Sequence, residues 1–238
     1  MEFLQTQDII ALIAVYILIA ASLILSRYAE SHGMSWDPRK IVHIGVGSFI
    51  YVWWAFTQNW IMLAFFAIPF AIVLFFAMIP GNPVSESSLG ELTSGKGHRF
   101  GLFLYVVSIC IMVAFFFDHW AAATIAIVAM TRGDGFGSII GRRFGKHPSL
   151  NGKTVEGSVG VFAATLAVSL LIVMLYGALT GAGFIPDGRG TVFEPMFAVG
   201  ACVLAASMAA VIETLSPGDF DNLLIPTIIA TVLVLIGM

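Results

Sequence analysis

The sequence has few charged residues for its length. Only 11% of its 238 residues are Asp, Glu, Lys or Arg, whereas 59% are hydrophobic. Soluble domains carry about 25% charged residues. A water-soluble fold of this size could not bury so much apolar surface, so lipid has to solvate much of the chain. The net charge of -3 is uninformative by itself, but no basic tail indicates a nucleic-acid partner.

Cysteine is scarce, and basic residues are missing from the N-terminal stretch. Cys110 and Cys202 each lie in an apolar run, without the paired spacing of a zinc site, a redox motif or a disulfide framework. No Lys or Arg precedes Arg27, and no small-residue cleavage site stands out. We therefore expect the first apolar run to remain as a membrane helix rather than to be removed as a signal peptide.

Long apolar runs dominate the chain. A spanning helix needs about 20 mostly apolar residues. Eight stretches meet or approach this length, at about 8–26, 41–57, 60–79, 100–117, 119–132, 158–180, 193–213 and 222–238. The sequence therefore predicts an all-α fold, a polytopic membrane helix bundle with about eight transmembrane helices in a single integral membrane domain, residues 1–238.

The basic residues fall in alternate connections between these runs. Ten of the eleven Lys and Arg residues lie in the first, third and fifth connections, and Arg189 alone lies on the other side. The positive-inside rule then predicts both termini on the outer side of the membrane. It places cytoplasmic loops at about 27–40, 80–99, 133–157 and 214–221.

The connection around Glu213–Asn222 lies on the same predicted side but has no Lys or Arg. It carries Glu213, Asp219 and Asp221 instead. One face of the membrane thus has both basic and acidic loops, as phosphoryl transfer with a divalent metal requires.

The segment 131–160 is rich in glycine and in basic residues. Glycine lets backbone N–H groups approach an anion closely, and Arg and Lys supply the charge that a polyphosphate needs. Asp134 stands between Gly133 and Gly135 at the end of a predicted span, a costly place for an unpaired carboxylate. The alternative interpretation is a positive-inside loop whose glycines serve helix packing. The segment is not a P-loop, because no G-x-x-x-x-G-K-[ST] occurs in it.

A second polar cluster begins the predicted span at 41–57. Arg39 and His43 are four residues apart and share a face if a helix starts at Pro38. Arg39 and Lys40 could simply be anchors at the membrane boundary. His43 lies one turn inside an apolar run, and an ionisable group there indicates a functional site.

The acidic connection offers oxygen ligands in close succession. Asp219, Asp221 and Asn222 suit Mg²⁺ held by one or two carboxylates together with substrate phosphates. Capping of the last span by Asp221 or Asn222 is the alternative, but it would not require Glu213.

Taken together, these motifs resemble the phytol kinase, dolichol kinase and polyprenol kinase family of membrane lipid kinases. They occur in the family's order and cover nearly the whole chain. The matching pieces are Arg39-Lys40-x-x-His43-x-Gly45, Gly133-Asp134-Gly135, Gly141-Arg142-Arg143-Phe144-Gly145-Lys146, Lys153-Thr154-x-Glu156-Gly157-Ser158, Glu213-x-Leu215 and Asp221-Asn222-x-x-x-Pro226.

The resemblance implies transfer of the γ-phosphate of a nucleoside triphosphate, usually CTP in this family, to a lipid hydroxyl. The acceptor would be a polyprenol, a phytol-like isoprenoid or diacylglycerol, and Mg²⁺ would be the cofactor. The enzyme would lie in the cell membrane among membrane lipids, with its active site facing the cytoplasm. We expect catalytic roles for Asp134, Glu213 and Asp221, and Mg²⁺ binding by Asp134, Asp221 and Asn222. We expect nucleotide binding by Gly133, Gly135, Arg142, Arg143, Lys146, Lys153, Glu156, Arg39, Lys40 and His43.

Two alternatives remain open at this point. Phosphatidate cytidylyltransferases, which make a CDP-lipid from CTP, share the G-R-x-F-G-K and K-T-x-E-G motifs. Their C-terminal K-D stretch and P-G-H-G-G-like ending are absent, and Glu213 and Asp221-Asn222 stand there instead. A non-enzymatic transporter or scaffold would be expected to place ionisable groups at mid-membrane, and apart from His43 the spans have almost none.

Overall fold

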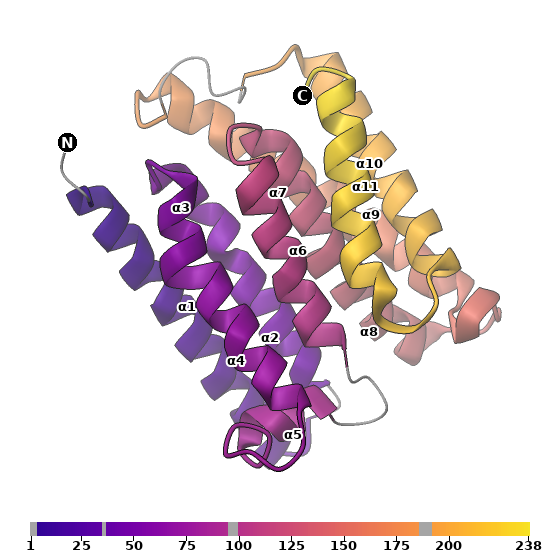
Figure 1. Ribbon diagram of the computed structural model, residues 1–238. Helices are drawn as coiled ribbons and strands as arrows, with labels where there is room; N and C mark the ends of the chain where they lie inside the picture. The colour runs from indigo at the N-terminus through magenta and orange to yellow at the C-terminus, as the bar shows by residue number, and fades with distance from the viewer. Residues whose placement is uncertain (1–3, 35–36, 95–99, 186–191) are drawn as a thin grey trace. The chain divides into compact units, whose positions relative to one another are not determined.

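A computed structural model of the chain describes residues 4–34, 37–94, 100–185 and 192–238. In these ranges the chain is helical and forms no β-sheet, which confirms the predicted all-α class (Figure 1). Lys96, Arg99 and Arg189, on which part of the predicted orientation rests, lie outside the described residues.

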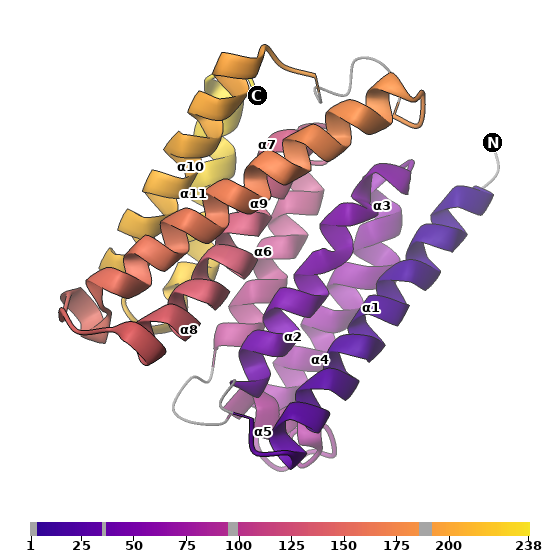
Figure 2. The ribbon, with the colours of Figure 1, turned by 180° about the vertical axis from the view of Figure 1, so that it is seen from behind.

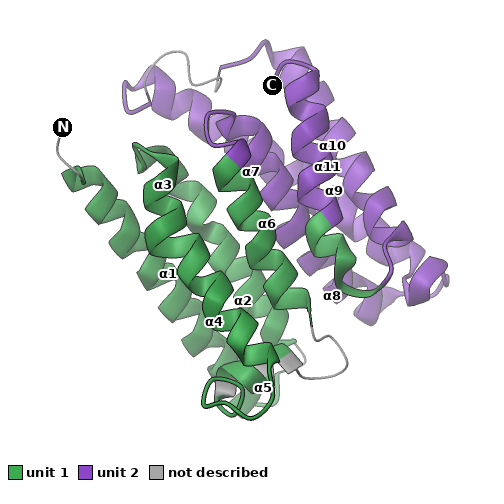
Figure 3. Cartoon of the chain, in the orientation of Figure 1, with its two compact units in different colours: residues 1–114, 218–223 green, residues 115–217, 224–238 purple. Residues whose placement is uncertain are grey.

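The chain divides into two compact units (Figure 3). The first unit comprises residues 1–114 and 218–223, and the second comprises residues 115–217 and 224–238. The predicted acidic connection is therefore shared, since Glu213 belongs to the second unit and Asp219, Asp221 and Asn222 belong to the first.

The first unit contains six α-helices within its described residues. They are α1 (Thr6–Ser31), α2 (Pro38–Val46), α3 (Asn59–Met62), α4 (Ile68–Met78), α5 (Ser88–Ser94) and α6 (Gly101–Phe115). A π-helical turn, Leu63–Ala67, joins α3 to α4 into one helical run. Pro69 lies at the start of α4 and has no N–H to donate, so the widened turn before it is expected.

The start of α1 is tied to the segment before α3 through a buried carboxylate. Asp8 is fully buried, and its two oxygens accept hydrogen bonds from the backbone N and the Oγ1 of Thr57, at 2.8 and 2.9 Å. Asp8 also accepts from the N of Gln5 at 3.1 Å, which completes a capping box. One buried carboxylate thus satisfies donors from two parts of the unit.

The predicted second span, 41–57, is not a continuous α-helix. It is α-helical only to Val46 and continues as 3₁₀ turns, Gly47–Tyr51 and Trp53–Ala55. Two glycines in the run lower its α-helical propensity, and Gly45 lies where a Cβ would collide with Ser22 of α1. This close approach to α1 suits a short, tightly packed segment better than a regular spanning helix.

The second unit contains α7 (Trp120–Val128), α8 (Asp134–Phe144), α9 (Val155–Gly181), α10 (Pro195–Leu215) and most of α11 (Asp221–Leu235). A π-helical turn, Ala129–Gly133, links α7 directly to α8. The predicted short fifth span at 119–132 therefore does not end in a loop, since the helix continues to Phe144.

The glycines of the second unit let α8 pack closely on α9 (Figure 2). Gly133, Gly137 and Gly141 recur every four residues and so share one helix face. A Cβ on Gly137 would overlap Val161 and would lie 3.1 Å from the carbonyl oxygen of Gly157. The structure supports the interpretation in which these glycines serve helix packing, because small residues at this spacing allow two helix backbones to approach closely.

Helix caps define where the long helices of this unit begin. Thr154 Oγ1 accepts from the N of Gly157 at 3.1 Å at the start of α9. Glu194 accepts from the N of Phe197 at 2.7 Å at the start of α10. Hydrogen bonds from the backbone N of Met196 and of Phe197 lower the pKa of the exposed Glu194 carboxyl.

Five helical runs are long and apolar enough to cross a membrane, among the described residues. They are Thr6–Ser31, Asn59–Met78, Val155–Gly181, Pro195–Leu215 and Gly218–Leu235. A sixth, Gly101–Phe115, is apolar but shorter. The chain is a helical membrane protein, and the count of eight spans stays a prediction.

Candidate active site

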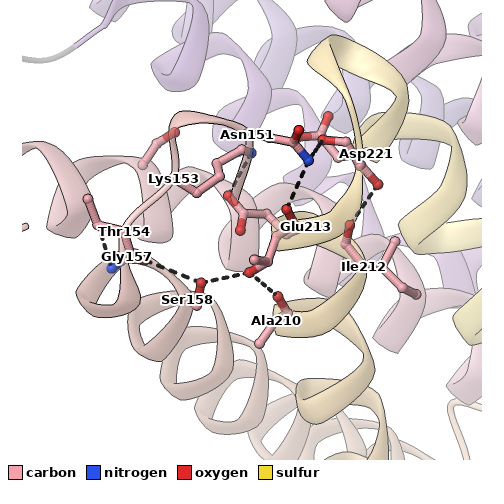
Figure 4. Close-up of polar contacts among 12 residues, drawn as sticks. Asn151, Lys153, Thr154, Gly157, Ser158, Ala210, Ile212, Glu213 and Asp221 are labelled. Atoms are coloured by element: carbon pink, nitrogen blue, oxygen red, sulfur yellow. Dashed lines mark hydrogen bonds and ion pairs between the residues drawn. The ribbon is translucent and has the colours of Figure 1, made fainter. Parts of the chain in front are cut away.

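Two of the predicted site residues form an ion pair across the second unit (Figure 4). Lys153 Nζ lies 2.7 Å from Glu213 Oε1. Glu213 sits in the last turn of α10 and is only 4% exposed, whereas the Lys153 side chain is 25% exposed. Glu213 Oε2 is buried and has no hydrogen-bond partner among the described residues. A buried carboxylate with one oxygen left unsatisfied is costly unless a ligand completes it.

The hairpin His147–Val155 carries Lys153 to this position. The N of Ser149 donates to the carbonyl of Lys153 at 2.8 Å, and the N of Val155 donates to that of His147 at 3.0 Å. The turn of the hairpin is left-handed, with φ of 54° at Asn151 and 73° at Gly152. These internal hydrogen bonds make the segment a defined hairpin rather than a flexible loop.

Glu156, in the first turn of α9, supports the other end of this hairpin. Its Oε2 accepts from the backbone N of Lys146 at 3.1 Å and from that of His147 at 3.3 Å. Its Oε1 lies 2.6 Å from His147 Nδ1. Glu156 thus orders the turn that presents Lys146, and its predicted part in nucleotide binding stays a prediction.

Asp134 and its neighbours lie at the junction between the π-helical turn and α8. Asp134 is 2% exposed and Arg132 is 5% exposed, and Arg132 Nη1 donates to Thr131 Oγ1 at 2.9 Å. π-helical turns occur often at functional sites. Gly133 faces α9, where a Cβ would collide with Thr165 Oγ1, so its contribution is close packing.

The basic residues at the end of α8 are exposed. Arg142 Nε donates to the carbonyl of Ser138 at 3.3 Å, and the Arg143 guanidinium lies 5.4 Å from the centre of the Phe144 ring. Lys146 follows in the exposed turn. These cations stabilise the C-terminal end of the α8 dipole and are accessible to an anion.

The basic cluster of the first unit is organised locally. Asp37 caps α2 by accepting from the N of Arg39 at 3.1 Å, and its Oδ2 pairs with Arg39 Nη2 at 3.0 Å. Lys40 is half-buried beside it. Asp37 was missed in the sequence, although an Asp directly before a Pro is a typical helix N-cap.

His43 is buried, as expected for a histidine one turn inside an apolar run. Its ring lies 4.1 Å from the ring of Tyr105, and Tyr105 donates its hydroxyl to the backbone carbonyl of His43 at 3.0 Å. Tyr105 of α6 therefore fixes the middle of α2, and no pattern in the sequence had linked these two residues.

The acidic residues of the first unit gather at the start of α11. Asp219 Oδ2 accepts from the N of Phe100 at 3.3 Å, and Asp221 Oδ1 accepts from the N of Asn222 at 2.8 Å. Ser108 of α6 donates to the carbonyl of Asn222 at 2.6 Å. Asn222 Oδ1 is buried and has no hydrogen-bond partner among the described residues.

The oxygen atoms of Asp221 and Asn222 suit a Mg²⁺ ion that takes its remaining ligands from the phosphates of a substrate. Among the described residues, no group of three or more His, Cys, Asp and Glu side chains is arranged to hold a metal ion. Asp221 and the unsatisfied amide oxygen of Asn222 supply hard oxygen ligands, and Mg²⁺ commonly takes its other ligands from water and phosphates. Asp134, the third predicted ligand, belongs to the other unit, and its place in this set stays a prediction.

Comparisons with known proteins identify relatives that are lipid kinases by name. A probable phytol kinase of Triticum aestivum is 30% identical over 206 residues, which cover 82% of this chain and 65% of the wheat protein. A phytol kinase of Synechocystis is 28% identical over 79% of this chain and 74% of its own length. A farnesol kinase of Arabidopsis thaliana is 26% identical over 66% of this chain and 52% of its own length.

The chain thus spans between about half and three quarters of the length of these relatives. No protein-family model matches the chain. No solved structure matches it either. The similarity to proteins named phytol kinase and farnesol kinase extends over most of the chain. These relatives support the assignment of the chain to the phytol and polyprenol kinase family.

Proposed function

We propose that this protein is a membrane lipid kinase that transfers the γ-phosphate of CTP to the hydroxyl of an isoprenoid alcohol. Relatives that are named phytol kinase and farnesol kinase support the choice of acceptor. A polyprenol or diacylglycerol is the broader acceptor class that the motifs allow. The choice of CTP rests on the motif resemblance.

The observation that carries the proposal is the Lys153–Glu213 ion pair. Burial of Glu213 costs desolvation energy that a structural role alone does not repay well, because buried ion pairs contribute little net stability. The hairpin that carries Lys153 begins directly after Lys146, so it is close in sequence to the exposed basic end of α8. A partly exposed cation anchored by a buried carboxylate is suited to hold a phosphate in one position.

In this proposal the phosphates bind to basic side chains of the second unit. Arg142, Arg143, Lys146 and Lys153 neutralise the polyphosphate, and Glu156 keeps the Lys146 turn in place. For Arg39, Lys40 and His43, which belong to the first unit, the proposed role in nucleotide binding rests on the motif resemblance. Phosphoryl transfer depends mainly on such positioning and charge stabilisation.

The acceptor's tail stays in the hydrocarbon, so its hydroxyl meets the nucleotide at the membrane boundary. The hydroxyl oxygen attacks the γ-phosphorus, the bond from that phosphorus to the β,γ-bridging oxygen breaks, and CDP leaves. The hydroxyl proton passes to a carboxylate, for which Asp134 is our first candidate. By the motif resemblance, Glu213 and Asp221 are the other two candidate catalytic carboxylates.

Mg²⁺ would be held by Asp134, Asp221 and Asn222, and when bound it would neutralise charge on the β- and γ-phosphates. We place this site on the cytoplasmic side, because the basic connections lie there by the positive-inside rule.

The proposal is tested by presenting the purified protein in detergent with Mg²⁺, γ-labelled CTP and separate acceptors: phytol, farnesol, a longer polyprenol and diacylglycerol. We expect label in an isoprenoid phosphate, with unlabelled CTP competing better than ATP. Label in diacylglycerol alone would overturn the acceptor, and stronger competition by ATP would overturn the donor. No labelled lipid from any acceptor would contradict the kinase assignment.

A further inference from the structure

The side chain of Asn151 ties the hairpin His147–Val155 to the end of α10. Its Nδ2 lies 3.2 Å from the carbonyl oxygen of Thr214, 3.1 Å from that of Leu215 and 3.5 Å from that of Ser216 (Figure 4). The last carbonyls of an α-helix lack partners within the helix. The last turn of α10 carries no basic residue to satisfy them. Asn151 therefore caps a helix that is more than 60 residues away in sequence.

The backbone at this position also selects asparagine. Asn151 has φ 54° and ψ 31° inside the hairpin turn, and it is the one residue other than glycine with positive φ among the described residues. Asn enters the left-handed region at lower cost than most residues. The neighbouring Gly152 could share that conformation but has no amide with which to reach α10.

The Asn151 bonds and the Lys153–Glu213 pair join the same two segments. Lys153 is two residues beyond Asn151, and Glu213 directly precedes Thr214. Ser158 adds a hydroxyl hydrogen bond to Thr214 at 2.8 Å. The position of the Lys153 ammonium relative to α10 is therefore set by contacts on both sides of it.

We propose that Asn151 is a positioning residue, which holds Lys153 against Glu213 so that its ammonium is ready for the transferred phosphate. This inference rests on the proposed function of Lys153. Asn151 itself touches neither nucleotide nor lipid. Its contribution is to keep the hairpin in one place on α10, and this reduces the ordering that phosphate binding would otherwise require.

Three variants distinguish the contribution of the Asn151 side-chain amide from that of the backbone conformation at this position. Asn151→Gly keeps the left-handed turn but removes the amide, and Asn151→Asp keeps the shape but sets a carboxylate against three carbonyl oxygens. Ser149→Gly is the matched control, because it adds the same backbone freedom to the same hairpin and removes no contact with α10. We expect kcat/KM for CTP to fall about tenfold in Asn151→Gly and further in Asn151→Asp, the size of one or two lost hydrogen bonds. Ser149→Gly should stay within about twofold of the wild type.

A double-mutant cycle shows whether Asn151 acts through Lys153. In a Lys153→Met background we expect Asn151→Gly to change kcat/KM by less than about twofold, because the group it positions is gone. A second tenfold loss in that background would mean that Asn151 acts elsewhere and would overturn the inference.

Limited trypsin digestion gives a result that does not depend on activity. Cleavage after Lys153 should be faster in Asn151→Gly than in the wild type or in Ser149→Gly, because the hairpin is released from α10. Equal rates of cleavage in all three proteins would show that the Asn151 amide does not hold the hairpin on α10. Faster cleavage with unchanged kcat/KM would overturn the positioning role and leave the proposed function intact. If the wild type phosphorylates no alcohol, the proposed function fails, and the digestion still decides whether Asn151 holds the hairpin.

Discussion

The two units of this protein hold their predicted site charges in different ways. In the first unit, Arg39 pairs with Asp37, two residues away, and the pair also caps α2. In the second unit, Lys153 pairs with Glu213, sixty residues away, at the end of a different helix. A local pair can form in many folds and therefore says little about function. A pair between distant segments exists only because the fold brings the segments together.

Burial sharpens this difference. The Asp37–Arg39 pair satisfies both partners through backbone and side-chain hydrogen bonds. Glu213 keeps one buried oxygen without a hydrogen-bond partner among the described residues. We infer that the charged pair of the second unit matters more for activity than the basic cluster of the first unit. Substitutions in the two units test this inference through the size of their effects on activity and stability.

The largest effect is expected from Lys153→Met. Loss of a charge that stabilises the transferred phosphate should lower kcat/KM by about 10² to 10³, measured as label transferred from γ-labelled CTP. Glu213→Gln should lower it comparably by releasing Lys153. Glu86→Gln, which removes an exposed carboxylate of the first unit, is the matched control and should be silent.

Lys153→Met also leaves the Glu213 charge buried without its partner, which costs about 3–5 kcal/mol of stability. The double variant Lys153→Met/Glu213→Gln removes both charges and should recover much of the loss in Tm but none of the activity. Recovery of activity in the double variant would show that the pair is structural only.

The next effect is expected from Gly137→Ala, which probes the α8–α9 contact. The added Cβ would overlap Val161 and approach the carbonyl of Gly157. Overpacking of this kind costs about 1–3 kcal/mol, so the Tm in detergent should fall. Gly177→Ala is the control on α9, because among the described residues no atom beyond the local helix backbone lies within 4 Å of its Cβ position. It should keep or raise the Tm, since Ala favours a helix over Gly. Equal effects of the two changes would contradict close packing at Gly137.

A smaller effect is expected from Arg39→Gln. The side chain already pairs with Asp37, so we expect the KM for CTP to rise only about two- to fivefold, as for one weakened interaction. Kinetics with CTP as the varied substrate measure this. A loss of kcat/KM as large as that in Lys153→Met would contradict the inference that the charged pair of the second unit matters more for activity.

The smallest effect concerns the exposed cap Glu194, a local interaction within the second unit. Hydrogen bonds to the backbone N of Met196 and Phe197 lower the pKa of its carboxyl below the usual 4.5. Since the folded-state pKa is the lower one, the stabilisation is present above the unfolded pKa and is lost as the pH falls through the folded value. The Tm difference between wild type and Glu194→Gln should therefore be constant from pH 6 to 8 and shrink below about pH 4.5. A difference that changes near neutrality would contradict this assignment.

Much of the fold could be predicted from apolar run lengths. The runs at 8–26, 60–79, 158–180 and 193–213 correspond to candidate spanning helices in the structure. In the run at 41–57 the α-helix ends at Val46 and 3₁₀ turns follow. Average hydropathy does not register this change or the packing of Gly45 on Ser22. The glycine-rich segment was interpreted mainly as a phosphate-binding loop. Its four-residue spacing of glycines was the signal for helix packing that could have been weighed more heavily.

The site was predictable only as a set of residue types. Lys153 and Glu213 were chosen because charges at the ends of apolar runs need a reason to be there. Their direct pairing was not predictable, because one sequence contains no information on contacts across sixty residues. Asn151 was missed for the same reason, although Asn-Gly before Lys153 is a recognisable turn signal.

The most direct test of the central claim is a double-label experiment on the purified protein. CTP carrying one label on the γ-phosphate and another on the base is incubated with Mg²⁺ and either phytol or phosphatidate, for wild type and Asp134→Asn in parallel. We predict that the wild type moves only the γ-label into the lipid and leaves the base label in CDP, and that Asp134→Asn stays folded but transfers neither. Entry of the base label into a phosphorylated lipid with release of pyrophosphate would instead show a cytidylyltransferase. Undiminished transfer by Asp134→Asn would contradict the catalytic role of that residue.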